Sequence, residues 1–149
     1  MNASAMCPGL IIFNAAWAAR IALYDSPETF HAFKSTVGHE LTHKDKEINR
    51  MMYSGAERKF IAQLNEVHAD FGGADKMFAS SRDALLRAIE YRKSIIPPGQ
   101  DNGDFAHPPW WKRYEYAKGA LFGKDLICQI ACDNHCENEE LIQKSHQFL

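Results

Sequence analysis

The stretch Val37-Gly-His-Glu-Leu-Thr-His43 decides how this chain is expected to fold, because it places the pattern H-E-x-x-H within a segment of helical periodicity. Residues four apart on a helix lie one above the other, so His39 and His43 can direct their imidazoles toward one metal ion. Glu40 points to the side of that pair, where its carboxylate can reach a water on the metal. With seven histidines in 149 residues, the pattern can also arise by chance on a solvated helix face.

The helix that carries this pattern is predicted to run from residue 27 to about residue 52. Ser26 can cap its start, and Pro27 fits the first helical position, where a missing N–H costs nothing. Glu28 suits the positive end of the helix dipole. Inside the helix, Gly38 costs about 1 kcal/mol relative to alanine, which suggests a close approach of a neighbouring backbone. We expect one apolar stripe to face the core. It consists of Phe30, Phe33, Val37 and Leu41.

A second helix is predicted over about residues 56–72. Ser54 and Glu57 have the spacing of a capping box at its start. The pair Gly72-Gly73 weakens the helix and is expected to end or kink it. The face expected in the core carries Phe60, Leu64, Val67 and Phe71.

A third metal ligand is available on this second helix. Glu66 and Asp70 lie one turn apart, and an antiparallel helix hairpin would bring their face against His39 and His43. Glu66 is placed to bind the metal, and Asp70 to accept the other ring N–H of a ligand histidine. The alternative third ligand is His68, which lies about 200° from Glu66 around the helix, so only one of the two can face the pair.

The remaining sequence predicts a small sheet before these helices and more helices after them. The apolar run Leu10–Phe13 is typical of a buried strand. Over residues 20–24, polar or small residues alternate with large apolar ones, which is typical of a second strand. The strands are therefore expected within about residues 9–24. Helical segments separated by loops are expected over the C-terminal part, residues 81–149. No repeat or linker divides the sequence, so we expect one domain over residues 1–149.

Composition limits the classes of partner. A net charge of -2 gives no general attraction to nucleic acid or anionic lipid. No apolar run approaches the roughly 20 residues that cross a bilayer. The apolar start of the chain lacks a basic region and is interrupted by Asn14 and Arg20, which is unlike a signal peptide. We therefore expect a cytoplasmic protein with no nucleic-acid partner and no membrane span, and the oligomeric state stays open.

Three of the four cysteines, Cys128, Cys132 and Cys136, are spaced to lie on one face of a helix. Structural zinc sites usually use C-x-x-C turns instead. We expect reduced, partly buried thiols on a C-terminal helix. The alternative is a second metal or redox site with His135 nearby.

The sequence resembles the gluzincin zinc metallopeptidases, above all the group that contains the HtpX-type and CaaX-prenyl proteases. Beyond H-E-x-x-H, three features match the pattern of that group. They are E-x-x-x-D at Glu66 and Asp70, H-P-x-x-x-x-R from His107 to Arg113, and Asn14-Ala15 after an apolar strand, in the order of the family. The resemblance implies an α+β fold in which a small N-terminal sheet of two or more strands packs on a mostly helical, zincin-like domain. Because membrane helices are absent, the likeness is to a minimal, soluble gluzincin.

The resemblance also implies roles for individual residues. His39, His43 and Glu66 would hold one catalytic Zn²⁺, Glu40 would be the general base, and Asp70 would orient a ligand histidine. His107 would stabilise the oxyanion, Arg113 would organise the site, and Asn14 and Ala15 would bind the substrate backbone. Residue chemistry alone leaves open that His107 only begins a helix and that Arg113 only forms a salt bridge.

The expected function is zinc-dependent hydrolysis of a peptide or protein by a metal-activated water. Two alternatives stay open: an ImmA-type regulatory protease that acts on one specific partner, and a metal-stabilised, non-catalytic interaction domain with a fourth protein ligand, most readily a cysteine. A peptidase of this kind would be latent if the C-terminal tail covered its cleft.

Overall fold

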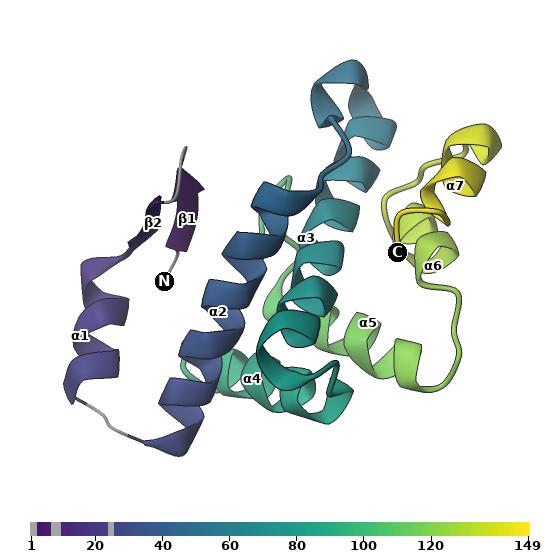
Figure 1. Ribbon diagram of the computed structural model, residues 1–149. Coiled ribbons are helices and arrows are strands. Elements are labelled where there is room, and N and C mark those ends of the chain that lie inside the picture. The colour runs from purple at the N-terminus through teal and green to yellow at the C-terminus, as the bar shows by residue number, and fades with distance from the viewer. Residues whose placement is uncertain (1–2, 7–9, 24–25) are drawn as a thin grey trace.

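Two long helices, α2 (Pro27–Asp45) and α3 (Gly55–Phe78), run antiparallel and side by side through the centre of the molecule (Figure 1). The computed structural model describes residues 3–6, 10–23 and 26–149. The other described elements are β1 (Ala3–Met6), β2 (Leu10–Phe13), α1 (Ala15–Leu23), the 3-10 helix η1 (Arg50–Met52), α4 (Arg82–Ser94), α5 (Trp110–Leu121), α6 (Leu126–Asp133) and α7 (Glu139–Ser145).

Small residues let α2 and α3 touch backbone to backbone. A Cβ atom on Gly38 would lie 2.7 Å from the carbonyl oxygen of Gly73, and a Cβ atom on Gly73 would lie 2.7 Å from the backbone nitrogen of His39. The close approach expected at Gly38 is therefore confirmed. The expectation that Gly72-Gly73 ends the second helix is wrong, because α3 continues to Phe78 and uses Gly73 at the crossing.

The predicted first residues of the two long helices agree with the structure more closely than their predicted last residues. Ser26 caps α2 by accepting the N–H of Thr29 at 3.1 Å, as predicted. Ser54 precedes α3, but its side chain makes no capping hydrogen bond, and Glu57 instead accepts a hydrogen bond from the Asn138 amide at 2.9 Å. The first long helix ends at Asp45 rather than near residue 52, because the backbone becomes extended at the next residue.

The hydrophobic core forms around α3. As predicted, Phe60, Leu64, Val67 and Phe71 are buried there, and α4, α5, α6 and α7 add further buried apolar side chains. The core face expected for α2 is wrong: Phe30 is 56% exposed and Leu41 is 36% exposed. The buried face of α2 instead carries Thr29, Ala32, Gly38, His39, Glu40 and Thr42. At Gly38 and Thr42 this face meets the Gly72-Gly73 pair of α3, where the helices cross too closely for large side chains.

The expectation of an α+β fold with an N-terminal sheet is wrong, because the described chain is predominantly helical. Strand pairing in the described part is confined to the hairpin of β1 and β2, with four residues in each strand. This hairpin stands beside α2 and does not form a sheet beneath the helices (Figure 1).

The second expected strand is also wrong where it is described, since residues 20–23 belong to helix α1. Alanine is the strongest helix former, and four alanines precede the alternating residues. Asn14 starts α1 by accepting the Ala16 N–H at 2.9 Å. Gly9 and Tyr24, at the ends of the expected strand region, lie outside the described residues.

None of the helices described here combines the length and the apolar character that crossing a membrane requires.

Candidate metal centre

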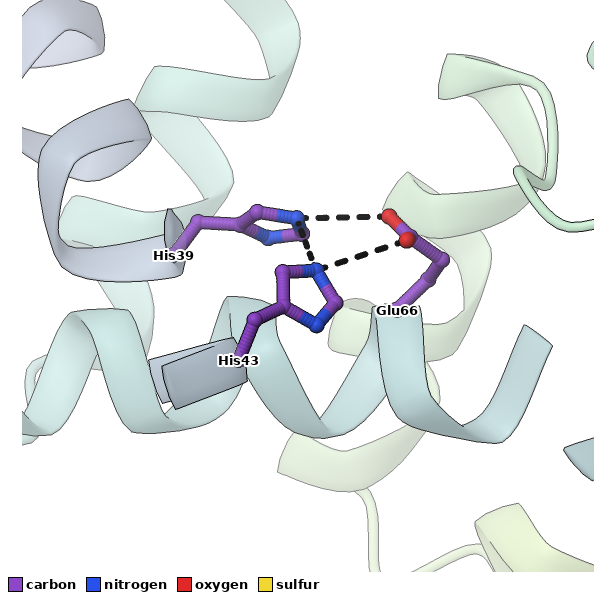
Figure 2. A group of neighbouring side chains, drawn as sticks. All are labelled: His39, His43 and Glu66. Carbon is purple, nitrogen blue, oxygen red and sulfur yellow. Dashed lines mark hydrogen bonds and ion pairs between the residues drawn. The ribbon is translucent and has the colours of Figure 1, made fainter. Parts of the chain in front are cut away.

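Three side chains from α2 and α3 converge where the two helices cross. Nε2 of His39 and Nε2 of His43 lie 2.9 Å apart. The Glu66 carboxylate faces both rings, with Oε2 at 3.3 Å from His39 Nε2 and Oε1 at 3.4 Å from His43 Nε2 (Figure 2). The one-turn spacing within H-E-x-x-H places the histidines, and the antiparallel α3 supplies Glu66.

These distances suit one tetrahedral zinc ion. Ligand atoms at about 2.0–2.2 Å from zinc lie about 3.3–3.5 Å from one another at tetrahedral angles. Each ring nitrogen lies at this separation from a different oxygen of Glu66, so the carboxylate would turn or bind through both oxygens. The two nitrogens would move apart by about 0.4–0.6 Å. Glu66 Oε2 is buried and has no hydrogen-bond partner, which leaves it available as a ligand. The residues present therefore fit a metal.

The outer nitrogens of both rings face carboxylates. His39 Nδ1 lies 2.9 Å from Asp70 Oδ1, and His43 Nδ1 is paired with Glu47 Oε1. A carboxylate only accepts, so each Nδ1 carries the hydrogen, and a neutral ring then presents the lone pair of Nε2 to the cluster. Two lone pairs and a carboxylate converge without a hydrogen between them. A cation, either a metal or protons, has to occupy such an arrangement.

In the metal-free protein, protons take that role. Burial alone would lower the pKa of His43, but hydrogen bonds and charge interactions with Glu47 and Glu66 raise it to about 10. Burial alone would also lower the pKa of His39, but hydrogen bonds and charge interactions with Asp70 and Glu66 raise it. Burial opposes ionisation of Glu66, yet the two histidines and Arg113 hold its pKa well below the ordinary value. The cluster therefore favours bound positive charge.

Arg113 holds Asp70 in place. Its Nε donates to Asp70 Oδ2 at 2.8 Å, and its Nη2 donates to Asp70 Oδ1. Burial alone would lower the pKa of Arg113, but its contacts with Asp70 raise that pKa, so the pair stays charged. The guanidinium also lies 4.0 Å from the centre of the Trp110 ring and 3.9 Å from Glu66 Oε2. Arg113 thus supports the carboxylate that orients His39.

His107 lies at the rim of the cluster, and its side chain is 53% exposed. Its Nε2 is 3.5 Å from Glu66 Oε1, while its Nδ1 is 2.8 Å from Asp104. Asp104 also accepts the backbone N–H groups of Ala106 and His107, both at 2.8 Å. These bonds fix the loop before α5, so His107 is held beside the cluster without being buried in it.

Glu40 follows His39 directly on α2 and is buried, with 7% of its surface exposed. No hydrogen bond joins its carboxylate to another residue in the described ranges. Its negative charge acts on two buried arginines, Arg92 and Arg113, and favours their charged forms against the effect of burial. Glu40 is thus an unbonded carboxylate beside the ligand pair.

The structure distinguishes the two candidate third ligands. Glu66 faces the histidines, whereas His68 stacks on Phe148, with ring centres 4.1 Å apart. Phe148 belongs to the C-terminal tail, which therefore packs on the side of α3 that carries His68. No hydrogen bond or ion pair within the described ranges joins this tail to Glu66.

Asn14 and Ala15 are exposed at the start of α1. They follow β2, as the sequence suggested, but the Asn14 side chain caps α1. No interaction within the described ranges joins either residue to the metal cluster.

Sequence reasoning did not identify two partners of the site histidines. Glu47 lies beyond the end of α2, and its spacing of four residues from His43 was the signal that could have identified it. For Asp104 the signal was its position, since an aspartate three residues before a histidine can bond both its backbone and its ring.

Comparison of the chain with known protein families, with curated proteins and with solved structures finds no match.

Proposed function

We propose that the protein is a zinc-dependent peptidase in which His39, His43 and Glu66 hold the ion and Glu40 is the general base. One observation carries the proposal: two imidazole nitrogens and the carboxylate of Glu66, with its unbonded Oε2, converge at the helix crossing. Three protein ligands leave a fourth position open, which is typical of catalytic rather than structural zinc.

A bound zinc ion would supply Lewis acidity toward a carbonyl oxygen and lower the pKa of a water molecule. Glu40 accepts the proton of the attacking water on a carboxylate oxygen and returns it to the leaving amine. His107, fixed through Nδ1 by Asp104, would stabilise the negative charge that develops on the substrate in its imidazolium form, which carries a hydrogen on Nε2 as well. Asp70 and Arg113 keep the His39 ring in the orientation that exposes its Nε2.

The substrate in this proposal is a peptide or protein, and the net charge of -2 gives no reason to invoke nucleic acid. We place the protein in the cytoplasm, because Cys128, Cys132 and Cys136 are free thiols, as is usual in a reducing compartment. A partner-specific regulatory protease is the second form of the same proposal, supported by the same cluster.

The test compares Glu40→Gln with Glu28→Gln, a matched change on the exposed start of α2. We expect both variants to keep one zinc at the cluster, measured by elemental analysis after His39→Ala is shown to remove it. Hydrolysis of an unstructured polypeptide should fall about 10²–10⁴-fold in Glu40→Gln and stay unchanged in Glu28→Gln. Full activity of Glu40→Gln would show that the assigned base is wrong. Hydrolysis confined to one partner protein would favour the regulatory form.

A further inference from the structure

A second group of metal-ligating side chains lies on the C-terminal helices, outside the cluster at the α2–α3 crossing. Asp125 caps α6, Cys128 lies in the first turn of that helix, and His146 directly follows α7. One ligand atom from each lies within 4.8 Å of the other two, and all three residues are exposed. Oxygen, sulfur and nitrogen donors from two helices are thus gathered at one place.

Backbone groups orient the outer atoms of this cluster. His146 Nδ1 lies 3.0 Å from the carbonyl oxygen of Ile142, so Nδ1 carries a hydrogen and donates it. Asp125 Oδ1 accepts the backbone N–H of Cys128 at 3.1 Å. The inner atoms then face each other: His146 Nε2 donates to Asp125 Oδ2 at 2.9 Å, and a metal would replace this hydrogen between them. Ligands held by such outer hydrogen bonds are characteristic of metal sites.

Two other functions of these residues fit the geometry less well. A cysteine nucleophile requires a ring nitrogen against its thiol, but both nitrogens of His146 are already engaged, by Ile142 and Asp125. A three-cysteine site is also disfavoured, because Cys136 is buried in the core while Cys128 and Cys132 are exposed.

We propose that Asp125, Cys128 and His146 bind a second zinc ion, which joins the start of α6 to the end of α7. A thiolate, an imidazole and a carboxylate are all zinc ligands, and exposed side chains can close from 4.8 Å to tetrahedral separations by rotation. The two helices have only eight and seven residues, and helices of that length are marginal without tertiary support. The ion would supply that support independently of the first site.

Cobalt(II) replaces zinc as the probe, because only a thiolate ligand gives an intense sulfur-to-cobalt charge-transfer absorption in the near ultraviolet. The cluster of His39, His43 and Glu66 contains no sulfur, so this absorption reports the second site alone. The reduced, metal-free full chain is titrated with cobalt(II) without oxygen. We expect the absorption to reach the intensity of one thiolate-bound cobalt per chain in both proteins, by about two equivalents of total cobalt in the wild type, which has two sites, and by about one in His39→Ala.

Matched variants identify the ligands. Cys128→Ser and His146→Ala should lose the absorption, whereas Cys132→Ser and His135→Ala, which change exposed residues of the same region outside the cluster, should keep it. Far-ultraviolet circular dichroism shows whether each variant is folded. No absorption in the wild type, or its survival in Cys128→Ser or His146→Ala, would overturn the proposal and leave an ion pair of Asp125 and His146. Equal loss in Cys132→Ser would also overturn it.

Discussion

A Cβ atom added to Gly73 would lie 2.7 Å from the backbone nitrogen of His39, so α2 and α3 are in backbone contact at the first residue of the metal cluster. The same crossing brings Glu66 within 3.3 Å of His39. The separation of the helices and the geometry of the cluster are therefore set by the same contact. A residue that only packs can in this way control the geometry of the proposed metal ligands.

Gly73→Ala is expected to destabilise the protein by about 1–3 kcal/mol, because the new methyl group overpacks two rigid backbones. Zinc affinity should fall together with the free energy of unfolding, since the helices must separate. Urea unfolding and zinc titration measure the two effects.

Gly119→Ala is the matched control for that change. Gly119 lies within α5, and its nearest neighbours would be flexible side-chain ends of Gln129 and Lys124 at 3.4 Å. Alanine should therefore stabilise this variant by up to about 1 kcal/mol through helix propensity. Equal effects of the two substitutions would contradict the backbone contact at Gly73.

Glu66→Gln is expected to lower zinc affinity by more than the roughly 10–100-fold that follows removal of a ligand's hydrogen-bond partner. The amide loses the charge and one of the two oxygens that face the histidines. His68→Gln, two residues away on the same helix, should leave zinc affinity unchanged, because His68 packs on Phe148. Zinc titration against a competing chelator compares them, and the reverse order of effects would make His68 the ligand.

The spacing of residues along each helix predicted most of the proposed metal ligands and their partners. The one-turn spacings of His39 with His43 and of Glu66 with Asp70 are properties of a helix, and a short connection makes two helices antiparallel. The structure places these four side chains together. Glu47 was missed although it follows His43 by four residues, and the contact forms through the extended backbone after α2 rather than through the helix that was predicted to reach about residue 52.

The fold class was harder to predict, because two short-range signals competed with tertiary contacts. Residues 20–23 alternate as in a strand, but the preceding alanines and the Asn14 cap extend a helix through them. Gly73 has a low helix propensity and still lies inside α3, because only glycine admits the backbone of α2 there. The polar face of α2 is buried for the same reason.

Arg113→Met is expected to destabilise the protein by about 3–5 kcal/mol, because it leaves the buried carboxylate of Asp70 without its partner. Adding Asp70→Asn should recover part of this loss, since the uncompensated charge is then removed. Arg87→Met is the control: its ion pair with Asp83 is exposed, so the change should be below about 1 kcal/mol. Urea unfolding measures all three, and strictly additive losses in the double variant would contradict the coupling.

The zinc-free protein is expected to lose stability as the pH rises from 6.5 to about 10. Burial alone would lower the pKa of His43, but Glu47 and Glu66 raise it from 6.5 to about 10 in the folded state. A pKa that is raised by folding stabilises the fold fully below 6.5, and that contribution is lost as the pH passes through the higher value. Zinc affinity should change in the opposite direction, because the ligands must lose protons.

Urea unfolding across this pH range, with a chelator present, measures the loss. His43→Gln should show a smaller fall in the free energy of unfolding than the wild type, whereas the exposed His135→Gln should match the wild type. A wild-type stability that rises over the same interval would contradict the assigned role of Glu47 and Glu66.

His107→Gln tests the oxyanion role and is expected to lower kcat by about 10²–10³-fold with little change in zinc content. The reason is geometric: Nε2 of His107 faces the cluster at 3.5 Å from Glu66 Oε1, yet half of the side chain stays exposed, so it can meet a substrate. Asp104→Asn should show a smaller loss of kcat, because the ring remains but its orientation is less strongly fixed. His135→Gln, which changes an exposed histidine outside both clusters, is the control and should keep full activity. A loss of zinc from His107→Gln in proportion to the loss of activity would instead make His107 a metal ligand.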